Sequence, residues 1–400
     1  MATYYMPVKV FEETDVVRKK AGEIAKLGSK ALIVTGKHSA KANGSLDDVI
    51  AALDEYNISY IHFNKIEENP LVETVMEAVD FAKNENVDFV VAIGGGSPLD
   101  AAKAIALMLK HPEEDSSYLF RAGGDDSHLP LCLIPTTCGT GSEVTGVSVL
   151  TRNDIKTKQS ISFKIFGDIA LLDGKYLESL SPKVLKNTAM DAFCHLVESY
   201  VNNNATIYSR IVCLDGLSSF KNVLPVVKGE KKPELSDYFN LLRTSTYAGM
   251  AIAQTGTAIP HGLSYAFTYN LGVEHGRACG YFLAGYLKIA CKKWTCLSQE
   301  LSDYFKTNLN NKFSTVGEAE VNFILNTAGI ASVEEFEKLY ALVCEKVEVE
   351  EAKLNKELDN TVNDLFNNKA KLSVAPFTIT KEELTEIAYD ISRKNKDCIK

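Results

Sequence analysis

The chain has 400 residues, a formal net charge of −9, 46% hydrophobic residues and 24% charged residues. This length exceeds that of a typical single domain, so we expect two domains with substantial cores. The negative charge disfavours nucleic acid or an anionic membrane surface as a partner. No apolar run approaches the roughly 20 residues of a membrane span, so no membrane-spanning helix is expected.

The first residues and the cysteines together predict a cytoplasmic protein. Residues 1–7 contain no basic region followed by an apolar core, so we expect no secretory signal. The nine cysteines are odd in number and form no Cys-x-x-Cys pair, which favours free thiols in a reducing compartment. Cys194 is interpreted as a packing residue, because buried free cysteine usually behaves as a small hydrophobe.

The first half of the sequence alternates between strand and helix signals. Short apolar runs predict buried strands at Lys30–Val34, Ser59–Phe63, Val87–Ile93 and Leu131–Ile134. Apolar residues at helical spacing predict one helix from Asn69-Pro70 to Phe81 and another from Pro98 to about Leu109. A βαβ series of this kind predicts a parallel sheet covered by helices.

The pattern changes class near residue 178. Extended segments are expected at Val147–Thr151, Lys158–Ser162 and Ile169–Leu172. Ser181-Pro182 then has the residue types of a helix N-cap and first helical residue, and helical periodicity dominates to the end. The charged stretch Glu345–Asn360 predicts a helix with one solvated face. The sequence therefore predicts an α/β domain over residues 1–178 and an all-helical domain over residues 179–400.

Two glycine-rich segments follow predicted strands. Gly94-Gly-Gly-Ser97 stands between a strand and a helix, where glycines admit an anion and a helix start offers free N–H groups. This is not the usual G-x-G-x-x-G fingerprint, and a simple tight turn is the alternative. Pro135–Thr145 adds hydroxyls and glycines after the next strand. In parallel sheets, ligands bind at the carboxyl ends of the strands, so both loops predict a pyrophosphate site.

Asp191, His195, His261 and His275 have the composition of an open divalent-metal site. Asp191 and His195 are four residues apart, which places both on one helix face. His261 and His275 each stand at or near an expected helix start. Imidazoles mixed with a carboxylate favour iron or zinc. The alternative is that each histidine is an ordinary surface or core residue; His38, His62, His111 and His128, near polar turns, are interpreted in that way.

The chain resembles the iron-dependent alcohol dehydrogenases, the group III or metal-containing class, over nearly its whole length. The most specific parts are Gly94–Lys103, Pro135–Thr145 and the set of one aspartate and three histidines, in the family's order and spacing. The resemblance implies a dinucleotide-binding α/β domain followed by an all-helical metal-binding domain, the two-domain architecture shared with dehydroquinate synthase. It also implies that all four metal ligands are present without substitution.

Carried over residue by residue, the resemblance implies a set of cofactor-binding residues. Gly95, Gly96 and Ser97 would hold the pyrophosphate, Thr136, Thr137 and Thr140 would border the ribose and pyrophosphate, and Lys158 would approach the ribose. Gly94 is the first glycine of this segment, and Asp100 is expected on the helix that follows it. For Asp100, a hydrogen bond that orients the loop and a plain surface carboxylate are both open.

Two positions depart from the pattern of many relatives. Tyr265 stands four residues after His261, where many members have a further histidine near the substrate and proton path. Tyrosine exchanges protons less readily than histidine at neutral pH. The resemblance therefore does not fix the proton route or the substrate preference. Gly36 stands where NAD-specific relatives often have aspartate. An acidic residue would repel a 2′-phosphate, so its absence, with Ser39 and Lys41 nearby, favours NADPH over NADH. Gly36, Lys37 and Ser39 are therefore candidate cofactor-binding residues, and the alternative is that Lys37 or Lys41 is simply solvated.

The resemblance implies a metal-dependent enzyme that interconverts a primary alcohol and its aldehyde by hydride transfer with NAD(P)H. Fe²⁺ is the expected metal, with Zn²⁺ as the alternative, and a small alcohol or aldehyde is the expected substrate. We expect a homo-oligomer, a dimer or larger. Two other functions remain open, namely a fold relative such as a glycerol dehydrogenase or a dehydroquinate-synthase-like lyase, and a non-catalytic nucleotide- or metal-binding protein.

Overall fold

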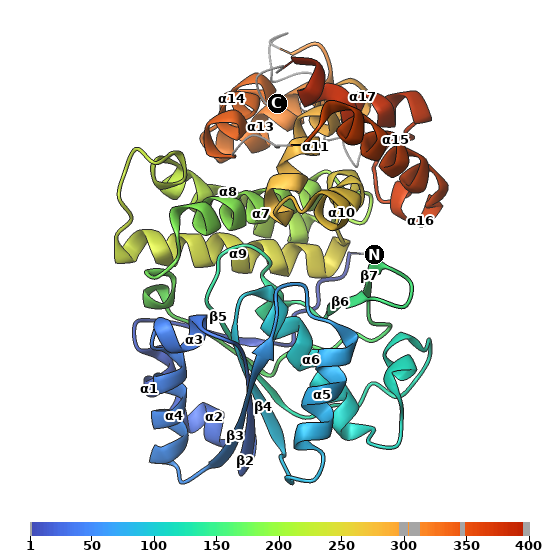
Figure 1. Cartoon of the computed structure of the whole chain (residues 1–400). Coiled ribbons are helices and arrows are strands. Elements are labelled where there is room, and N and C mark those ends of the chain that lie inside the picture. Colours follow the sequence, from blue (N-terminus) through green and yellow to red (C-terminus); the bar gives the residue numbers. More distant parts are fainter. Residues whose placement is uncertain (1, 296–302, 304–312, 345–348, 395–400) are drawn as a thin grey trace. The chain divides into compact units, whose positions relative to one another are not determined.

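Six strands pair in parallel in the order β1-β8-β5-β4-β2-β3 (Figure 1). They are β1 Lys9–Glu12, β2 Lys30–Gly36, β3 Ser59–Ile66, β4 Phe89–Gly94, β5 Leu131–Pro135 and β8 Ile169–Leu172. A separate antiparallel hairpin consists of β6 Val149–Arg152 and β7 Thr157–Ser160. Because the sheet is parallel, the carboxyl ends of its strands meet at one edge, which is where such sheets bind ligands.

The computed structural model describes residues 2–295, 303, 313–344 and 349–394. Its contacts divide the chain into two units. The sheet unit consists of Tyr5–Ser181 and Pro233–Leu242. The helical unit consists of the described residues of Met1–Tyr4, Pro182–Lys232 and Arg243–Lys400.

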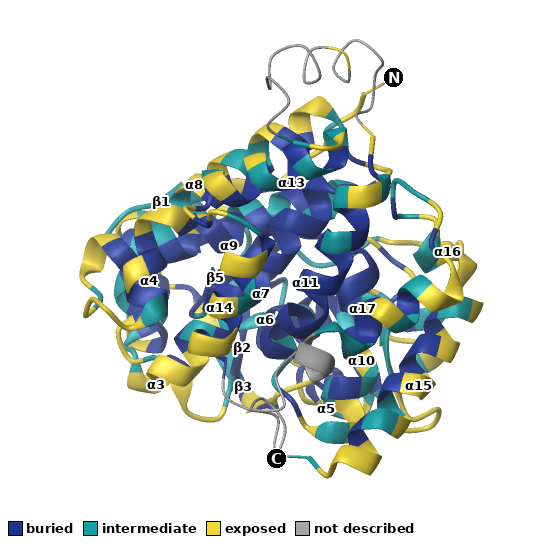
Figure 2. Ribbon diagram, turned by 90° about the horizontal axis from the view of Figure 1, so that it is seen from above, coloured by how far each residue is buried: buried dark blue, intermediate teal, exposed yellow. Residues whose placement is uncertain are grey.

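The described part of the helical unit contains helices but no strands. These are α7 Pro182–Tyr200, α8 Ile207–Lys228, α9 Leu235–Thr255 (whose first residues belong to the sheet unit), α10 Ile259–Leu271, α11 His275–Lys293, α13 Val316–Thr327, α14 Val333–Val343, α15 Glu351–Asn367, α16 Lys369–Leu372 and α17 Lys381–Lys394. α11 is buried along most of its length and contacts α7, α10, α13, α14 and α17 (Figure 2). It is therefore the central helix of this unit.

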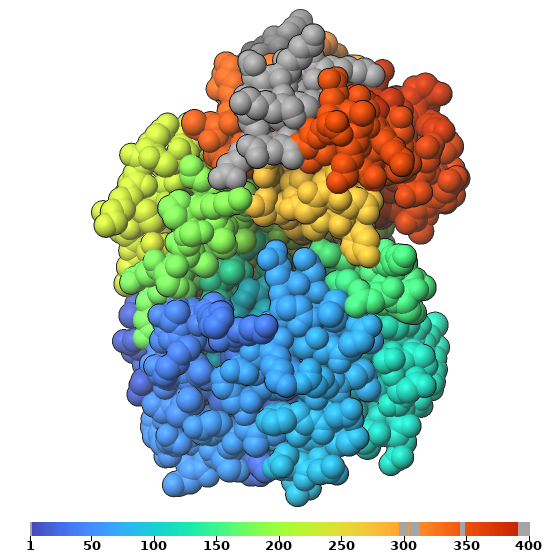
Figure 3. Space-filling model, in the orientation of Figure 1, coloured from blue at the N-terminus to red at the C-terminus, as the bar shows by residue number. Residues whose placement is uncertain are grey.

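Helices cover both faces of the sheet. They are α1 Val16–Lys19, α2 Ala21–Ala25, α3 Ser39–Ala42, α4 Ser45–Glu55, α5 Val72–Ala82 and α6 Gly96–Lys110, with short 3₁₀ turns η1 Ser116–Phe120, η2 Ser142–Val144 and η3 Gly174–Leu177. α5 is amphipathic, with Val75, Ala78 and Val79 buried and Glu73 and Asp80 exposed. Residues of α5, coloured light blue, lie at the surface in Figure 3.

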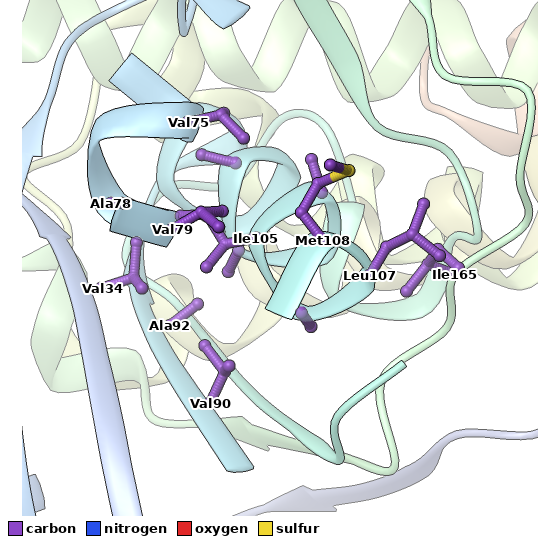
Figure 4. Close-up of a cluster of buried hydrophobic side chains, with 14 of the residues drawn as sticks. Val34, Val75, Ala78, Val79, Val90, Ala92, Ile105, Leu107, Met108 and Ile165 are labelled. Atoms are coloured by element: carbon purple, nitrogen blue, oxygen red, sulfur yellow. The ribbon is translucent and has the colours of Figure 1, made fainter. Parts of the chain in front are cut away.

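The sheet has a hydrophobic core on each face, because neighbouring residues of a strand point to opposite sides. In β2, Leu32 and Val34 belong to the cluster that α5 and α6 cover, and Ala31 and Ile33 belong to the cluster under α1, α2 and α4. Figure 4 shows the first cluster, in which Ile105 of α6 lies among side chains of the strands and α5. Burial on both faces explains why the strands appear in the sequence as continuous apolar runs.

The predicted fold class is confirmed, and each strand expected from an apolar run is present with shifted ends. The sequence analysis missed β1 and the four helices α1–α4. β1 lies at the edge of the sheet, and its four residues are exposed or only partly buried, so it has no buried apolar run. The helix expected to begin at Asn69-Pro70 begins instead at Val72, because Asn69 adopts a left-handed φ of 59° and Leu71 is extended.

Two further expectations concern helices, one in the sheet unit and one in the helical unit. α6 begins at Gly96, two residues before the expected start at Pro98. The charged stretch Glu345–Asn360 lies partly outside the described residues, and its described part belongs to α15, which buries Leu354 and Leu358 and exposes its charged side. Within the described chain, no helix is both long and apolar enough to cross a bilayer.

Candidate functional site

The helices of the helical unit bring the predicted metal ligands together. Asp191 and His195 lie one turn apart on α7 and are both buried. His261 is the third residue of α10, and His275 is the first residue of α11. Three separate helices therefore contribute the four side chains, and two of those side chains stand where a helix begins.

A glycine allows α11 to reach α7 at this point. A Cβ atom on Gly276 would lie 2.0 Å from the backbone oxygen of Asn187 and 2.8 Å from Cβ of Asp191. Real Cβ atoms do not come so close to a backbone oxygen, so a larger residue would push the first turn of α11 away from α7. Gly276 thus permits the approach that places His275 beside Asp191.

Oδ1 of Asp191 lies at the centre of the imidazoles. His261 Nε2 lies 3.5 Å from it, and the Nε2 atoms of His195 and His275 each lie 4.0 Å from it. The rings of His195 and His261 stack with their centroids 4.3 Å apart. All four predicted side chains are therefore within reach of one another, although His195 is not among the residues whose ligand atoms all lie within 4.8 Å of one another.

The chemistry of this cluster fits a divalent cation. Asp191 Oδ1 and His261 Nε2 are buried, and neither makes a hydrogen bond of ordinary geometry with the described residues. Buried polar groups without partners are rare in folded proteins and need an explanation. A metal ion among them would satisfy both atoms at once, which is the observation that supports a metal centre here.

Glu198, on the same helix as Asp191, orients one of the ligands and was missed in the sequence analysis. His261 Nδ1 donates a hydrogen bond to Glu198 Oε1 at 2.6 Å, and the backbone N–H of Ala258 donates to Oε2 at 2.7 Å. This bond places the proton on Nδ1 and leaves the lone pair of Nε2 facing Asp191. The sequence could have indicated Glu198 by its spacing, because it follows Asp191 by two turns of α7.

The electrostatics of the cluster favour the binding of a cation. Burial would raise the pKa of Asp191, but the surrounding imidazoles hold it well below its ordinary value. Burial lowers the pKa of His195 to about 4, which keeps that ring neutral and able to ligate. Burial also opposes protonation of His261, yet Cys279 and Glu198 raise its pKa. The anionic groups thus draw a cation into this place.

Cys279 is a second residue that the sequence analysis missed. Its Sγ lies 3.8 Å from Nε2 of His275, and it joins Asp191, His261 and His275 in the group of ligand atoms within 4.8 Å of one another. Cys279 is one helical turn after His275 on α11, so the i, i+4 spacing used for Asp191 and His195 could have indicated it.

Tyr265 lies beside the cluster. It is one turn after His261 on α10, and its ring is parallel to that of His275 with centroids 6.3 Å apart. Its side chain is 44% exposed, unlike the buried ligand His261. The structure therefore places a solvent-exposed tyrosine beside His275.

The predicted cofactor residues gather at the carboxyl edge of the sheet. β2, β4 and β5 are neighbours, with Thr35 paired to Ile93 and Gly94 to Pro135. The loops after these strands therefore start side by side. The backbone N–H of Thr136 donates to the Gly94 carbonyl at 2.8 Å, which continues the pairing into the loops.

Threonine side chains close over the glycine turn. A Cβ atom on Gly96 would lie 2.7 Å from the methyl group of Thr140, and one on Gly95 would lie 3.1 Å from Thr137. α6 starts at this turn, and no side chain of the described residues caps its N-terminus. The uncapped start of a 15-residue helix and two threonine side chains thus lie close together, which fits an anion such as a pyrophosphate.

Asp100 and Lys103 hold the second loop against α6. Asp100 accepts hydrogen bonds from the Ser142 hydroxyl at 2.5 Å and the Val149 N–H at 2.9 Å. Lys103 is fully buried and donates to the Ser142 carbonyl, the Ser142 hydroxyl and the Val147 carbonyl at 2.7–2.8 Å. Burial lowers the pKa of Lys103 to about 8. Asp100 therefore contacts the protein rather than lying as a plain surface carboxylate.

Asn69 connects two of the predicted cofactor residues. Its backbone N–H donates to the Ser97 hydroxyl at 3.1 Å, and its side-chain oxygen accepts from Lys158 Nζ at 2.6 Å. Its carbonyl accepts from Thr151. The left-handed backbone at Asn69 allows these contacts, and the Asn-Pro pair at 69–70 was the sequence signal, which had been interpreted as a helix start.

The last three predicted cofactor residues lie at the end of β2. Gly36 is its final residue, and Lys37 and Ser39 follow with exposed side chains. Lys41 forms an ion pair with Asp47, so it is engaged within the protein. No carboxylate is present at position 36, as the sequence showed.

A parallel sheet with an anion-binding edge and a buried centre of one aspartate and three histidines are together typical of metal-dependent, nucleotide-linked oxidoreductases. Comparisons with known proteins give the same class. The family model described as iron-containing alcohol dehydrogenase matches residues 7–174, and the C-terminal model of the Fe-containing alcohol dehydrogenase family matches residues 186–390. The chain belongs to the iron-containing alcohol dehydrogenase family.

Individual relatives agree with this assignment. The chain is 31% identical over 327 residues to long-chain-alcohol dehydrogenase 1 of Geobacillus thermodenitrificans, covering 80% of this chain and 78% of the relative. It is 29% identical over 270 residues to an NADPH-dependent butanol dehydrogenase of Clostridium saccharobutylicum, covering 66% and 69%. A solved iron-containing alcohol dehydrogenase of Thermotoga maritima is 33% identical, with a TM-score of 0.82 and coverage of 98% and 99%.

Replacing Glu198 with glutamine should weaken metal binding. The amide keeps the shape of the side chain but removes the charge that raises the basicity of His261. We expect metal affinity to fall about 10–100-fold, the usual effect of losing such a supporting group. Titration with a fluorescent metal competitor measures this. Glu320→Gln, at another buried carboxylate of the helical unit, is the control, and equal affinity in both variants would contradict the role of Glu198.

Replacing Lys103 with methionine should destabilise the sheet unit and loosen the loop after β5. The change leaves buried carbonyl and hydroxyl acceptors without a donor and Asp100 without its cation. We expect a loss of about 3–5 kcal/mol, as for breaking a buried charge pair, seen as a lower thermal midpoint and weaker nucleotide binding. Lys110→Met, at the exposed end of the same helix, is the control. An unchanged midpoint for the Lys103 variant would refute the anchoring role.

Proposed function

We propose that this oxidoreductase is a metal-dependent, NADPH-preferring enzyme that interconverts a primary alcohol and its aldehyde and acts mainly as an aldehyde reductase. The family membership supports the reaction class. The observation that carries the metal dependence is a pair of buried atoms, Asp191 Oδ1 and His261 Nε2, which lie 3.5 Å apart and make no ordinary hydrogen bond with the described residues.

Asp191, His195, His261 and His275 would hold the metal. Fe²⁺ is proposed from the family, and Zn²⁺ suits the same donors. When bound, a divalent metal polarises a carbonyl oxygen and stabilises the negative charge that grows on it during hydride transfer. The chain's part is to keep Asp191 ionised and His195 neutral, and through Glu198 to fix the tautomer of His261.

Tyr265 is proposed to exchange a proton near the substrate oxygen. Its ring is parallel to that of His275 and the residue is exposed, so we expect its hydroxyl group to reach both water and a molecule at the centre. The position is that of a histidine in many relatives. A phenol holds its proton more firmly than an imidazole does, so the pH dependence of turnover should differ from that of histidine-bearing relatives.

We propose that the pyrophosphate of the nicotinamide nucleotide binds at the start of α6, to Gly94, Gly95, Gly96 and Ser97. Thr136, Thr137 and Thr140 would border it, and Lys158 would reach the ribose from β7. In the structure Ser97 and Lys158 are both bound to Asn69, so one residue sets the position of two contacts. The hydride chemistry itself belongs to the nicotinamide.

The preference for NADPH is proposed from the end of β2. Gly36 brings no carboxylate that would repel a 2′-phosphate, and the exposed Lys37 and Ser39 follow it. One of the relatives carries NADPH dependence in its name. The alternative is NADH, with Lys37 a solvated surface residue.

The test is a coupled measurement of metal and turnover. Protein loaded anaerobically with Fe²⁺, or with Zn²⁺, is mixed with NADPH or NADH and a panel of short aldehydes, and loss of the reduced nucleotide is followed. We expect metal-dependent oxidation that is faster with NADPH. His261→Ala should lose bound metal and activity together, and Tyr265→Phe should keep the metal.

Three results would contradict the proposal. Full activity in metal-free His261→Ala would remove the metal from the reaction. Turnover of a substrate with no net change in reduced nucleotide would favour a dehydroquinate-synthase-like lyase. Bound nucleotide and metal without turnover of any aldehyde would favour a non-catalytic binding protein.

A further inference from the structure

The linker between α9 and α10 leads directly to His261. It consists of Gly256, Thr257 and Ala258, and Gly256 has a left-handed φ of 70°. The backbone N–H of Ala258 donates to Glu198 Oε2 at 2.7 Å, and Glu198 Oε1 accepts from His261 Nδ1 at 2.6 Å. The position of this linker therefore affects the carboxylate that orients His261.

Lys371 binds this linker from a distant part of the chain. It lies on the short helix α16, and its Nζ atom donates to the carbonyl oxygen of Thr257 at 2.6 Å and to the Thr257 hydroxyl group at 2.7 Å. Thr257 is the residue before Ala258, so the ammonium group is bonded to the same peptide unit whose N–H donates to Glu198. Any displacement of this peptide would move the N–H that holds Glu198.

The stem of Lys371 packs against the first turn of α10. Both α15 and α16 contact α10 (Figure 1). A Cβ atom on Gly262, the residue after His261, would lie 3.2 Å from Cγ and 3.3 Å from Cε of Lys371, and 2.9 Å from Cδ1 of Leu365. A larger residue at position 262 would therefore displace these side chains. The lysine is thus placed by packing as well as by its hydrogen bonds.

The positive charge of Lys371 also stabilises the Glu198 carboxylate. Glu198 is fully buried, and a buried carboxylate needs hydrogen bonds and opposite charge to stay ionised. Burial would raise the pKa of Glu198, but His261 and, more weakly, Lys371 hold it below its ordinary value. Lys371 therefore acts on Glu198 in two ways, by its charge and through the linker.

We propose that Lys371 is a positioning residue for the metal centre. It is not a ligand itself, but it fixes the linker and the carboxylate of Glu198, and Glu198 in turn orients His261. Groups that support a ligating histidine affect metal affinity strongly, although they never touch the metal. The inference rests on the proposed function in one respect, because it needs a divalent metal bound by His261. It is independent of the substrate and of the nucleotide.

A double-mutant cycle tests whether Lys371 acts through Glu198. The Zn²⁺ affinity of the full-length protein is measured by competition with a fluorescent chelator for the wild type, Lys371→Met, Glu198→Gln and the double variant. We expect Lys371→Met to weaken binding about tenfold, the lower end of the range for supporting groups. The double variant should bind about as weakly as Glu198→Gln alone, because residues that act through one contact do not have additive effects.

Two further variants separate this role from a general effect on folding. Lys369→Met is the matched control, because Lys369 lies on the same helix but donates to the Phe366 carbonyl at 3.1 Å. It should bind Zn²⁺ as the wild type does. Lys371→Arg keeps the positive charge and can donate to both oxygens of Thr257, so it should retain most of the affinity. Lys371 is only partly buried, so we expect all these variants to fold.

Three results would overturn the role of Lys371 alone. They are wild-type affinity in Lys371→Met, losses that multiply in the double variant, and an arginine variant that binds as weakly as the methionine variant. Failure of the folded wild-type protein to bind Zn²⁺ would overturn the proposed function as well.

Discussion

The buried carboxylate of Asp191 is the constraint on which the helical unit depends. A charge removed from water must be paired, and the described chain offers Asp191 Oδ1 only imidazoles at 3.5–4.0 Å and no hydrogen bond of ordinary geometry. Glu198 adds a second buried carboxylate behind His261. The folded chain therefore concentrates negative charge where four potential ligands meet, and a divalent cation resolves that imbalance.

In each unit, the candidate binding groups depend on close backbone approach. In the helical unit, Gly276 lets the first turn of α11 come against Asn187 of α7, which no residue with a Cβ atom could do without displacement. In the sheet unit, Gly96 lets Thr140 close over the start of α6. Lys103 and Asp100 then fix the position of this loop. Lys103 donates hydrogen bonds to Ser142, and Asp100 accepts one from the Ser142 hydroxyl. In each unit, packing sets the position of groups that we propose bind ligands.

The extent to which the sequence predicted the structure follows from these contacts. Apolar runs predicted the buried strands, and the i, i+4 spacing of Asp191 and His195 predicted a shared helix face, because both signals are local. Glu198, Cys279 and Asn69 were missed because their roles arise from contacts between different elements. β1 was missed because an edge strand that is never fully buried has no apolar run. Spacing along α7 and α11 could have indicated Glu198 and Cys279, whereas the bridge from Asn69 to Ser97 and Lys158 required the fold.

The central claim is that Asp191, His195, His261 and His275 hold one divalent metal ion. Anomalous diffraction from crystals of the protein loaded with Fe²⁺ or Zn²⁺, recorded on both sides of the metal's absorption edge, tests it most directly. The account predicts a single strong anomalous peak within bonding distance of Asp191 Oδ1 and the Nε2 atoms of all three histidines. A metal-loaded crystal with no peak there, or with its peak bound by other residues, would contradict it.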